Sequence, residues 1–252
     1  MSRFFISITL LLCFFNSSAQ DETIDLQPKD TVAHKQTYGL RVGIDLSRII
    51  ITQTNEDYKG LELVGDYRLT QKLYIAGELG NEEKTKQEDL YSFTTSGSYI
   101  KLGVDYNTYE NWYGMNNTIF LGGRFAVSSF SQTLNNFRYF DTNRYWYPDD
   151  FPNGSSDAQE FGSLNAAWLE FVFGMKAELF SNLYLGGSLR LGFLVSNKES
   201  EEFPNLFIPG FNKVTDGSKF GIGYNYSLTY MIPLYKKANK RKKKTDEGQV
   251  EP

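Results

Sequence analysis

Residues 220–232 read FGIGYNYSLTYMI, and this stretch decides the fold class. Large apolar or aromatic side chains occupy every second position from Phe220 to Ile232, while the intervening positions from Gly221 to Thr229 hold only Gly, Asn, Ser and Thr. A repeat of two residues is typical of a β-strand with one apolar and one polar face. The stretch therefore predicts a strand with apolar surroundings on one side only.

The same alternation recurs along the chain, at residues 38–47, 61–69, 73–80, 100–106, 119–128, 168–179 and 183–193. No charged residue falls on the apolar face of any of these segments. Their lengths are near the roughly 9 to 11 residues that a tilted strand needs to cross a bilayer. We therefore predict an all-β fold over residues 37–235, an eight-stranded antiparallel transmembrane β-barrel of the up-and-down meander type.

Alternation alone also fits a soluble, lipocalin-like ligand-binding barrel, in which the apolar face points inward. Three features favour the membrane barrel. The polar face mixes small residues with bulky charged ones, as the interior of a narrow barrel requires. The connections after the second, fourth and sixth segments form the shorter set, although residues 107–118 and 48–60 are similar in length. Aromatic residues such as Tyr38, Tyr106 and Tyr230 stand near the ends of the apolar stripes, where interface girdles belong.

Charged residues on the polar faces would point into the lumen of such a barrel. Because an eight-stranded barrel is just wide enough for side chains to fill it, these charges should pair into a buried network that plugs the lumen. A narrow channel or transport accessory, with these charges as a proton or ion pathway, is the alternative. The predicted network comprises Arg41, Asp45, Glu62, Asp66, Arg68, Glu78, Lys101, Asp105, Arg124, Glu170, Lys176, Glu178 and Arg190.

Composition argues against several functional classes. The mean hydropathy of -0.42 excludes a bundle of transmembrane helices. The single histidine, His34, precedes the first predicted strand, which argues against a His-dependent hydrolase or a His-ligated metal site. Glu170 and Glu178 could in principle form an acid–base pair, but Lys176 between them favours a place in the charge network. We expect no enzymatic activity, no cofactor and no metal.

The ends of the chain carry signals for export and location. Residues 1–20 have one positive charge, an apolar run and small residues before Gln20, which predicts a signal peptide. Residues 21–36 are expected to form a flexible periplasmic leader. Residues 236–252 form a basic periplasmic tail, with anionic lipid or an acidic partner as its candidate contact. We expect the cell outer membrane as the location, outer-membrane lipid as a partner and no nucleic acid.

The connection between the fifth and sixth predicted strands is rich in aromatic residues. Such residues either pack over the barrel mouth or bind sugars, peptides or proteins, and loops often carry function. This loop is our candidate surface for a ligand or partner protein, in a structural or adhesive role. Its candidate residues are Phe137, Tyr139, Phe140, Tyr145, Trp146, Tyr147 and Phe151.

Several stretches support a family resemblance. Residues 226–235 (YSLTYMIPLY) resemble the closing strand of small outer-membrane barrels typified by OmpA and OmpX, although a basic tail follows here. Residues 38–47 (YGLRVGIDLS), 59–68 (KGLELVGDYR), 78–84 (ELGNEEK) and 127–133 (VSSFSQT) resemble a family of uncharacterised Bacteroidota outer-membrane proteins with a domain of unknown function. This resemblance implies fold and location but no activity.

Overall fold

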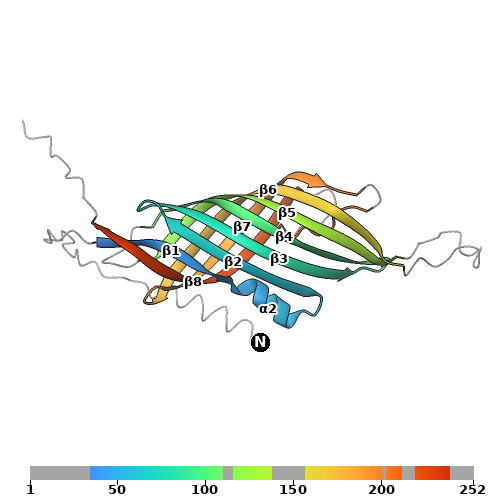
Figure 1. Cartoon of the computed structure of the whole chain (residues 1–252), viewed down its shortest axis with the longest axis horizontal. Helices are drawn as coiled ribbons and strands as arrows, with labels where there is room; N and C mark the ends of the chain where they lie inside the picture. Colours follow the sequence, from blue (N-terminus) through green and yellow to red (C-terminus); the bar gives the residue numbers. More distant parts are fainter. Residues whose placement is uncertain (1–34, 110–115, 138–156, 201–202, 212–218, 239–252) are drawn as a thin grey trace, which may run out of the picture. The chain divides into compact units, whose positions relative to one another are not determined.

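The computed structural model describes residues 35–109, 116–137, 157–200, 203–211 and 219–238. Its elements are β1 (Lys35–Asp45), α2 (Leu46–Thr54), β2 (Tyr58–Arg68), β3 (Leu73–Gln87), β4 (Tyr91–Asn107), β5 (Thr118–Phe137), β6 (Gln159–Phe180), β7 (Leu183–Lys198) and β8 (Phe220–Ala238). Each strand pairs antiparallel with the next, and β8 pairs with β1 to close the barrel (Figure 1). The predicted eight-stranded meander is confirmed. The predicted signal peptide, the leader up to His34 and the tail beyond Ala238 lie outside the described residues.

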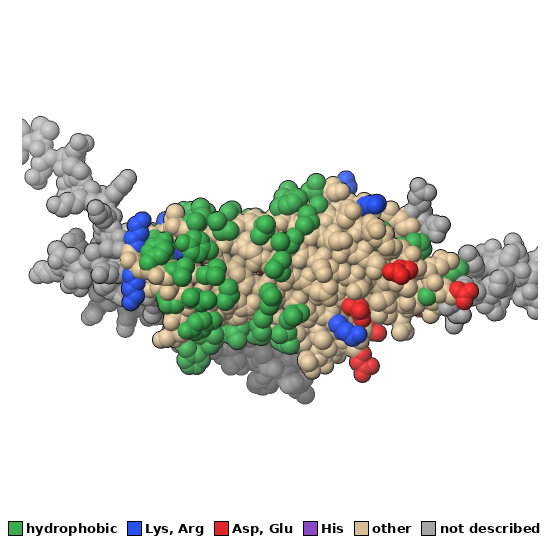
Figure 2. Space-filling model, viewed as in Figure 1, with side chains coloured by type: hydrophobic (Ala, Val, Ile, Leu, Met, Phe, Trp, Pro, Cys, Tyr) green, Lys and Arg blue, Asp and Glu red, His purple; other side chains and the backbone are tan. Residues whose placement is uncertain are grey.

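The apolar face of the predicted segments points outward. On β4, Leu102 is 57% exposed on the outer face of the barrel. Its neighbour Lys101 points into the barrel and is only 1% exposed. Figure 2 shows hydrophobic side chains gathered over one part of the barrel exterior, with acidic side chains towards one end. This orientation is the reverse of what the soluble, lipocalin-like alternative requires. An apolar exterior around a charged interior is the arrangement that lipid stabilises.

We call the band of outward-facing apolar side chains the lipid-facing belt. Beyond it the polarity of the barrel wall inverts. On β5, Ser129, Ser131 and Thr133 take the outward positions, while Phe130 and Leu134 are buried inside. The apolar residues inside this part form one cluster: Tyr99, Ala126, Phe130, Leu164, Ala166, Trp168, Leu194, Ile208 and Phe211. The strands thus continue past the lipid-facing belt as a water-facing extension with its own core.

This inversion explains why several strands are longer than the alternation indicates. Val127 faces outward and Phe130 inward, so the apolar residues here stand an odd number of positions apart and the repeat of two is interrupted. Residues 81–99 separate the predicted segments 73–80 and 100–106, so the alternation leaves them as a connection. In the structure they continue β3 and β4, and only residues 88–90 join these strands. The expected loop is therefore mostly sheet.

The first connection contains a helix that the alternation does not predict. The first strand is expected to reach Ser47, but β1 ends at Asp45, whose Oδ1 accepts a hydrogen bond of 2.7 Å from the Ser47 N–H and caps α2. Because β1 ends early, the place beside β2 and β8 that a longer β1 would occupy is taken by α2 (Figure 1). Thr52 Oγ1 accepts a hydrogen bond of 2.9 Å from the backbone N–H of Gly60 on β2, so helix side chains satisfy part of the open sheet edge.

Tyr38 has a different environment from the one expected. It is predicted to stand in an aromatic girdle on the lipid face, but it is buried, and the guanidinium of Arg68 lies 4.8 Å from its ring centre. The register between β1 and β8 shifts between Tyr38 and Gly39. The extra residue is Leu234 of β8, because Tyr38 pairs with Tyr235 and Gly39 with Pro233, so a bulge interrupts the regular pairing next to Tyr38.

Within the described part of the chain, no helix has the length and apolarity that a membrane-spanning helix requires.

Candidate functional site

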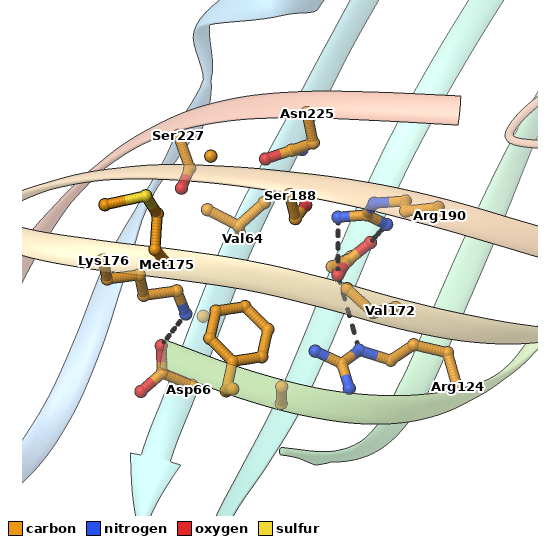
Figure 3. A pocket seen from close by; sticks show the side chains of 15 residues that line it. Val64, Asp66, Arg124, Val172, Met175, Lys176, Ser188, Arg190, Asn225 and Ser227 are labelled. Carbon is orange, nitrogen blue, oxygen red and sulfur yellow. Dashed lines mark hydrogen bonds and ion pairs between the residues drawn. The ribbon is translucent and has the colours of Figure 1, made fainter. Parts of the chain in front are cut away.

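The candidate site is the lumen, where charged side chains from strands β1 to β7 meet. One small cluster lies around Asp66 on β2. Its Oδ1 accepts a hydrogen bond of 2.7 Å from Arg41 Nε, and its Oδ2 lies 2.5 Å from Lys176 Nζ. Figure 3 shows Lys176 reaching towards Asp66 on one side of a cavity, with Arg124 and Arg190 on the other side. We call these three residues, Arg41, Asp66 and Lys176, the Asp66 cluster.

A larger cluster is organised around Arg190 on β7. Its guanidinium makes two contacts with the Glu78 carboxylate, one of them 3.1 Å from Nη2 to Oε1, and lies 3.4 Å from Glu170 Oε2. Lys101 Nζ lies 2.9 Å from Glu170 Oε1. Arg124 Nη1 lies 2.7 Å from Asp105 Oδ1.

Ion pairs connect this larger cluster to helix α2. Arg48 lies on α2, and its Nη1 is 2.9 Å from Glu82 Oε1. Its Nε is 3.8 Å from Glu62 Oε2. Arg190 lies 4.0 Å from Glu62 Oε1, which joins the two groups. We call the whole set the outer cluster: Asp45, Arg48, Glu62, Glu78, Glu82, Lys101, Asp105, Arg124, Glu170 and Arg190.

Residues 203–211 fill the barrel above the outer cluster, and we call them the plug segment. Ile208 is fully buried, and the Phe211 ring centre lies 5.5 Å from that of Trp168 on β6. The Gly210 N–H donates a hydrogen bond of 3.0 Å to Glu82 Oε2, and the Gly210 carbonyl accepts one of 3.1 Å from Lys101 Nζ. The plug segment is thus bound directly to the charges beneath it.

One lysine at the rim of the extension is affected by the plug segment. Lys84 Nζ lies 4.9 Å from the ring centre of Phe207. Burial at this position lowers the pKa of Lys84, because the charged form loses hydration.

Replacing Gly210 by Val is expected to release the plug segment. Gly210 has φ +82, and an added Cβ would lie 2.6 Å from Cγ of Tyr99. The backbone conformation alone costs about 1–2 kcal/mol for a residue with a side chain, so opening should become roughly tenfold or more frequent. Chymotrypsin cleavage after Phe207, followed by mass spectrometry, measures this opening. Gly162→Val is the matched control, because no atom lies within 4 Å of its added Cβ. Equal cleavage in both variants would contradict the prediction.

Little free space remains inside the barrel. The cavity of Figure 3 has a volume of about 30 Å³, and a second one beside Arg48 and Phe211 has about 10 Å³. A cavity needs roughly 10–15 Å³ to hold one water molecule. Each of these two cavities therefore has room for individual water molecules only.

Two of the predicted network residues have other contacts. Arg68 donates to the backbone carbonyls of Thr37 and Thr70. Glu178 is predicted to partner Lys176, but its Oε1 accepts a hydrogen bond of 2.9 Å from the Asn182 N–H and stabilises a turn. The remaining eleven predicted residues belong to the Asp66 cluster or the outer cluster: Arg41, Asp45, Glu62, Asp66, Glu78, Lys101, Asp105, Arg124, Glu170, Lys176 and Arg190.

The sequence did not reveal Arg48, Glu82 and Tyr99 as members of the site. Glu82 and Tyr99 lie in the expected connection between the third and fourth strands, and Arg48 lies in the unexpected helix. The signal that could have found Glu82 is its place in the alternation of β3, since Glu78, Gly80 and Glu82 share the inward face of that strand. Extending the alternation two residues past Gly80 would have included it.

Other predicted sites fall outside the described residues. Of the aromatic candidates, Phe137 ends β5 and lies opposite Tyr91 of β4. Tyr139, Phe140, Tyr145, Trp146, Tyr147 and Phe151 lie outside the described part of the chain, as do His34 and the basic residues beyond Ala238. Within the part that is described, no group of three or more His, Cys, Asp or Glu side chains is placed to hold a metal ion.

A closed eight-stranded barrel with an apolar exterior and a charge-filled lumen defines a small transmembrane β-barrel protein. The chain belongs to the DUF6048 family, described as a domain of unknown function, whose model matches residues 1–237. Membership of this family does not indicate any particular activity. An origin in Bacteroidota stays a prediction.

Comparison with solved structures finds similar small barrels. Ail, the attachment invasion locus protein of Yersinia pestis, is 8% identical with a TM-score of 0.40, and the match covers 79% of this chain and 99% of Ail. CarO2 of Acinetobacter baumannii is 9% identical with a TM-score of 0.40, and the match covers 79% of this chain and 100% of CarO2. No curated protein sequence matches the chain.

Proposed function

We propose that this protein is an integral outer-membrane barrel with a closed lumen, and that its role is structural or adhesive, through its outer surface. The lipid-facing belt supports the membrane location, because only helices and closed barrels satisfy their backbone groups in a bilayer. Closed barrels of this kind are typical of outer membranes. The export signal expected at residues 1–20 is consistent with this location.

The filled lumen is the observation that carries the proposal. The outer cluster and the plug segment occupy the interior, and the cavities of about 30 Å³ and 10 Å³ admit only individual water molecules. A narrow channel or transport accessory would need a continuous hydrated path. The charges are also engaged with one another: Arg124, for example, lies 2.7 Å from Asp105 and 3.5 Å from Glu78.

Reconstitution in a planar lipid bilayer tests the closed lumen. We expect no steady conductance from the full-length protein, because paired charged side chains and the plug segment occupy the described lumen. An open porin in the same bilayer is the positive control for insertion and recording. Steady, large conductance from the folded protein would refute the closed lumen and favour the channel.

The contact surface in this proposal is the aromatic segment between β5 and β6. Its described flanks, Phe137 and Gln159, stand at the water-facing extension of the barrel, beyond the lipid-facing belt. Aromatic residues at such a position are suited to bind sugars, peptides or a partner protein. The basic tail is a second candidate contact, for anionic lipid or an acidic periplasmic partner. We propose no catalytic role and no cofactor.

A further inference from the structure

The outer cluster contains more carboxylates than cations. Its ion pairs connect four cations, Arg48, Lys101, Arg124 and Arg190, with six carboxylates, Asp45, Glu62, Glu78, Glu82, Asp105 and Glu170. Two negative charges are therefore left without a cation inside this set. Burying uncompensated charge is costly, so each excess charge requires another source of stabilisation.

Asp45 has such a source in the backbone. It caps α2, and its Oδ1 accepts hydrogen bonds from the Ser47 N–H at 2.7 Å and from the Tyr226 N–H at 3.3 Å. The N-terminus of a helix also carries partial positive charge. Asp45 is thus stabilised as an anion, and one excess charge remains among the other carboxylates.

Two of those carboxylates converge on one hydroxyl group. The Tyr99 hydroxyl lies 2.5 Å from Glu62 Oε2 and 3.3 Å from Glu82 Oε1. Glu62 is 1% exposed and Glu82 is 0% exposed. A phenol has one hydrogen to donate and cannot satisfy two ionised carboxylates at once. Like charges that share a buried site favour the uptake of a proton by one of them.

The contacts of the two carboxylates differ. Glu82 has a cation at 2.9 Å, Arg48, and accepts the Gly210 N–H. Glu62 has its nearest cations at 3.8 Å and 4.0 Å, and accepts a hydrogen bond of 3.0 Å from the neutral amide of Asn225. Glu82 is therefore the better stabilised anion.

Arg48 supplies a second, independent observation. Its side chain is nine-tenths buried, and its Nε makes no hydrogen bond to any residue of the described barrel, although Asp45 Oδ2 lies 3.7 Å and Glu62 Oε2 3.8 Å away. Arg48 makes its close contact, at 2.9 Å, with Glu82. Of the two carboxylates that share the Tyr99 hydroxyl, Glu62 is therefore the one without a close cation.

We infer that Glu62, Tyr99 and Glu82 form a proton-binding site. The bound proton resides on Glu62 and is donated to the Tyr99 oxygen, while the Tyr99 hydrogen is donated to the Glu82 carboxylate. Loss of this proton leaves two adjacent carboxylates with one hydroxyl between them. Repulsion between these carboxylates favours movement of Glu82, which also accepts the Gly210 N–H. Proton loss therefore weakens the attachment of the plug segment. The ionisable groups that face Glu62 are Arg48, Glu78, Glu82, Tyr99, Lys101 and Arg190.

The variant Glu62→Gln tests the site, because it keeps the shape and fixes the neutral state. In the folded protein near neutral pH, we expect an infrared carbonyl band of a protonated carboxylic acid that is lost in Glu62→Gln. Glu83→Gln is the matched control, since Glu83 lies on the same strand as Glu82, outside the lumen, paired with Lys59 at 3.0 Å. The control should keep the band.

Hydrogen exchange of the plug segment gives an independent measurement. The ratio of exchange rates between the wild type and Glu62→Gln cancels the intrinsic effect of pH. We expect a ratio near one at about pH 5 and about ten or more at about pH 9, because the wild type alone loses the proton. An absent acid band in the folded wild type, or a ratio that does not change with pH, would overturn the inference. Tyr99→Phe, which removes the shared hydroxyl, should shift the band, and an unchanged band would count equally against it.

Discussion

Replacing Arg190 by Met is expected to lower the free energy of unfolding by about 3–5 kcal/mol, the usual cost of removing one partner of a buried ion pair. Arg190 contacts three carboxylates, Glu78, Glu170 and Glu62, and its side chain is nine-tenths buried. Without it, Lys101 and Arg124 are the cations of the outer cluster that remain near Glu78. The loss of charge balance, rather than of packing, should dominate, because Met is also a long side chain.

Urea titration of the refolded protein in lipid vesicles measures this effect, with the heat-dependent gel shift reporting the folded barrel. Lys198→Met is the matched control, since Lys198 lies on the same strand with an exposed side chain. The double variant Arg190→Met, Glu78→Gln should recover part of the loss, because it removes one of the carboxylates left without a partner. A loss below about 1 kcal/mol, the value typical of surface pairs, would contradict the buried network.

Replacing Leu102 by Arg is expected to lower the free energy of unfolding in lipid by about 2–4 kcal/mol, the cost of a basic residue on the lipid face near the bilayer midplane. Leu102 faces outward on β4, between Ile100 and Val104, which are also exposed. An arginine at this position would have to leave water for hydrocarbon. The same substitution on the water-facing extension avoids that transfer.

Ser129→Arg provides the comparison. Ser129 faces outward on β5, two residues beyond Val127, where the polarity of the wall inverts. We expect a change within about 0.5 kcal/mol there, as is usual for surface substitutions. Unfolding of both variants in vesicles, measured as for Arg190, tests the position of the lipid boundary. Equal losses at both positions would show that the boundary does not lie between them.

Most of the barrel wall could be predicted because its signal is local. A strand with lipid on one face and charges on the other repeats every two residues, and Lys101 beside Leu102 or Arg190 beside Leu191 displays this repeat directly. The inward direction of the charges was favoured by a second feature, the mixture of small and charged residues on the polar face, because the repeat itself fits either orientation. Most of the charged residues of the site could therefore be named before any contact between them was known.

The prediction failed where the local environment changes along one strand. Val127 and Phe130 are both apolar, but one faces lipid and the other faces the core of the extension. The repeat of two is lost at such a point, although the strand continues. Of the proton-binding site the pattern identified Glu62 and could have reached Glu82 by extending the alternation of β3, but Tyr99 is an aromatic residue on the inward face of β4, where only polar residues were expected.

The sequence determined the eight strands through their alternation, which depends only on neighbours along the chain. The mixed small and charged residues of the polar faces, the connection lengths and the aromatic residues near the strand ends favoured an apolar exterior around a charged lumen. The tertiary structure decided which charges meet, that α2 replaces a strand against β2 and β8, and that residues 203–211 fill the barrel. Gly210 and Glu82 are joined by a hydrogen bond although they are 128 positions apart. Contacts of that kind depend on the closure and register of the whole barrel, which no local repeat encodes.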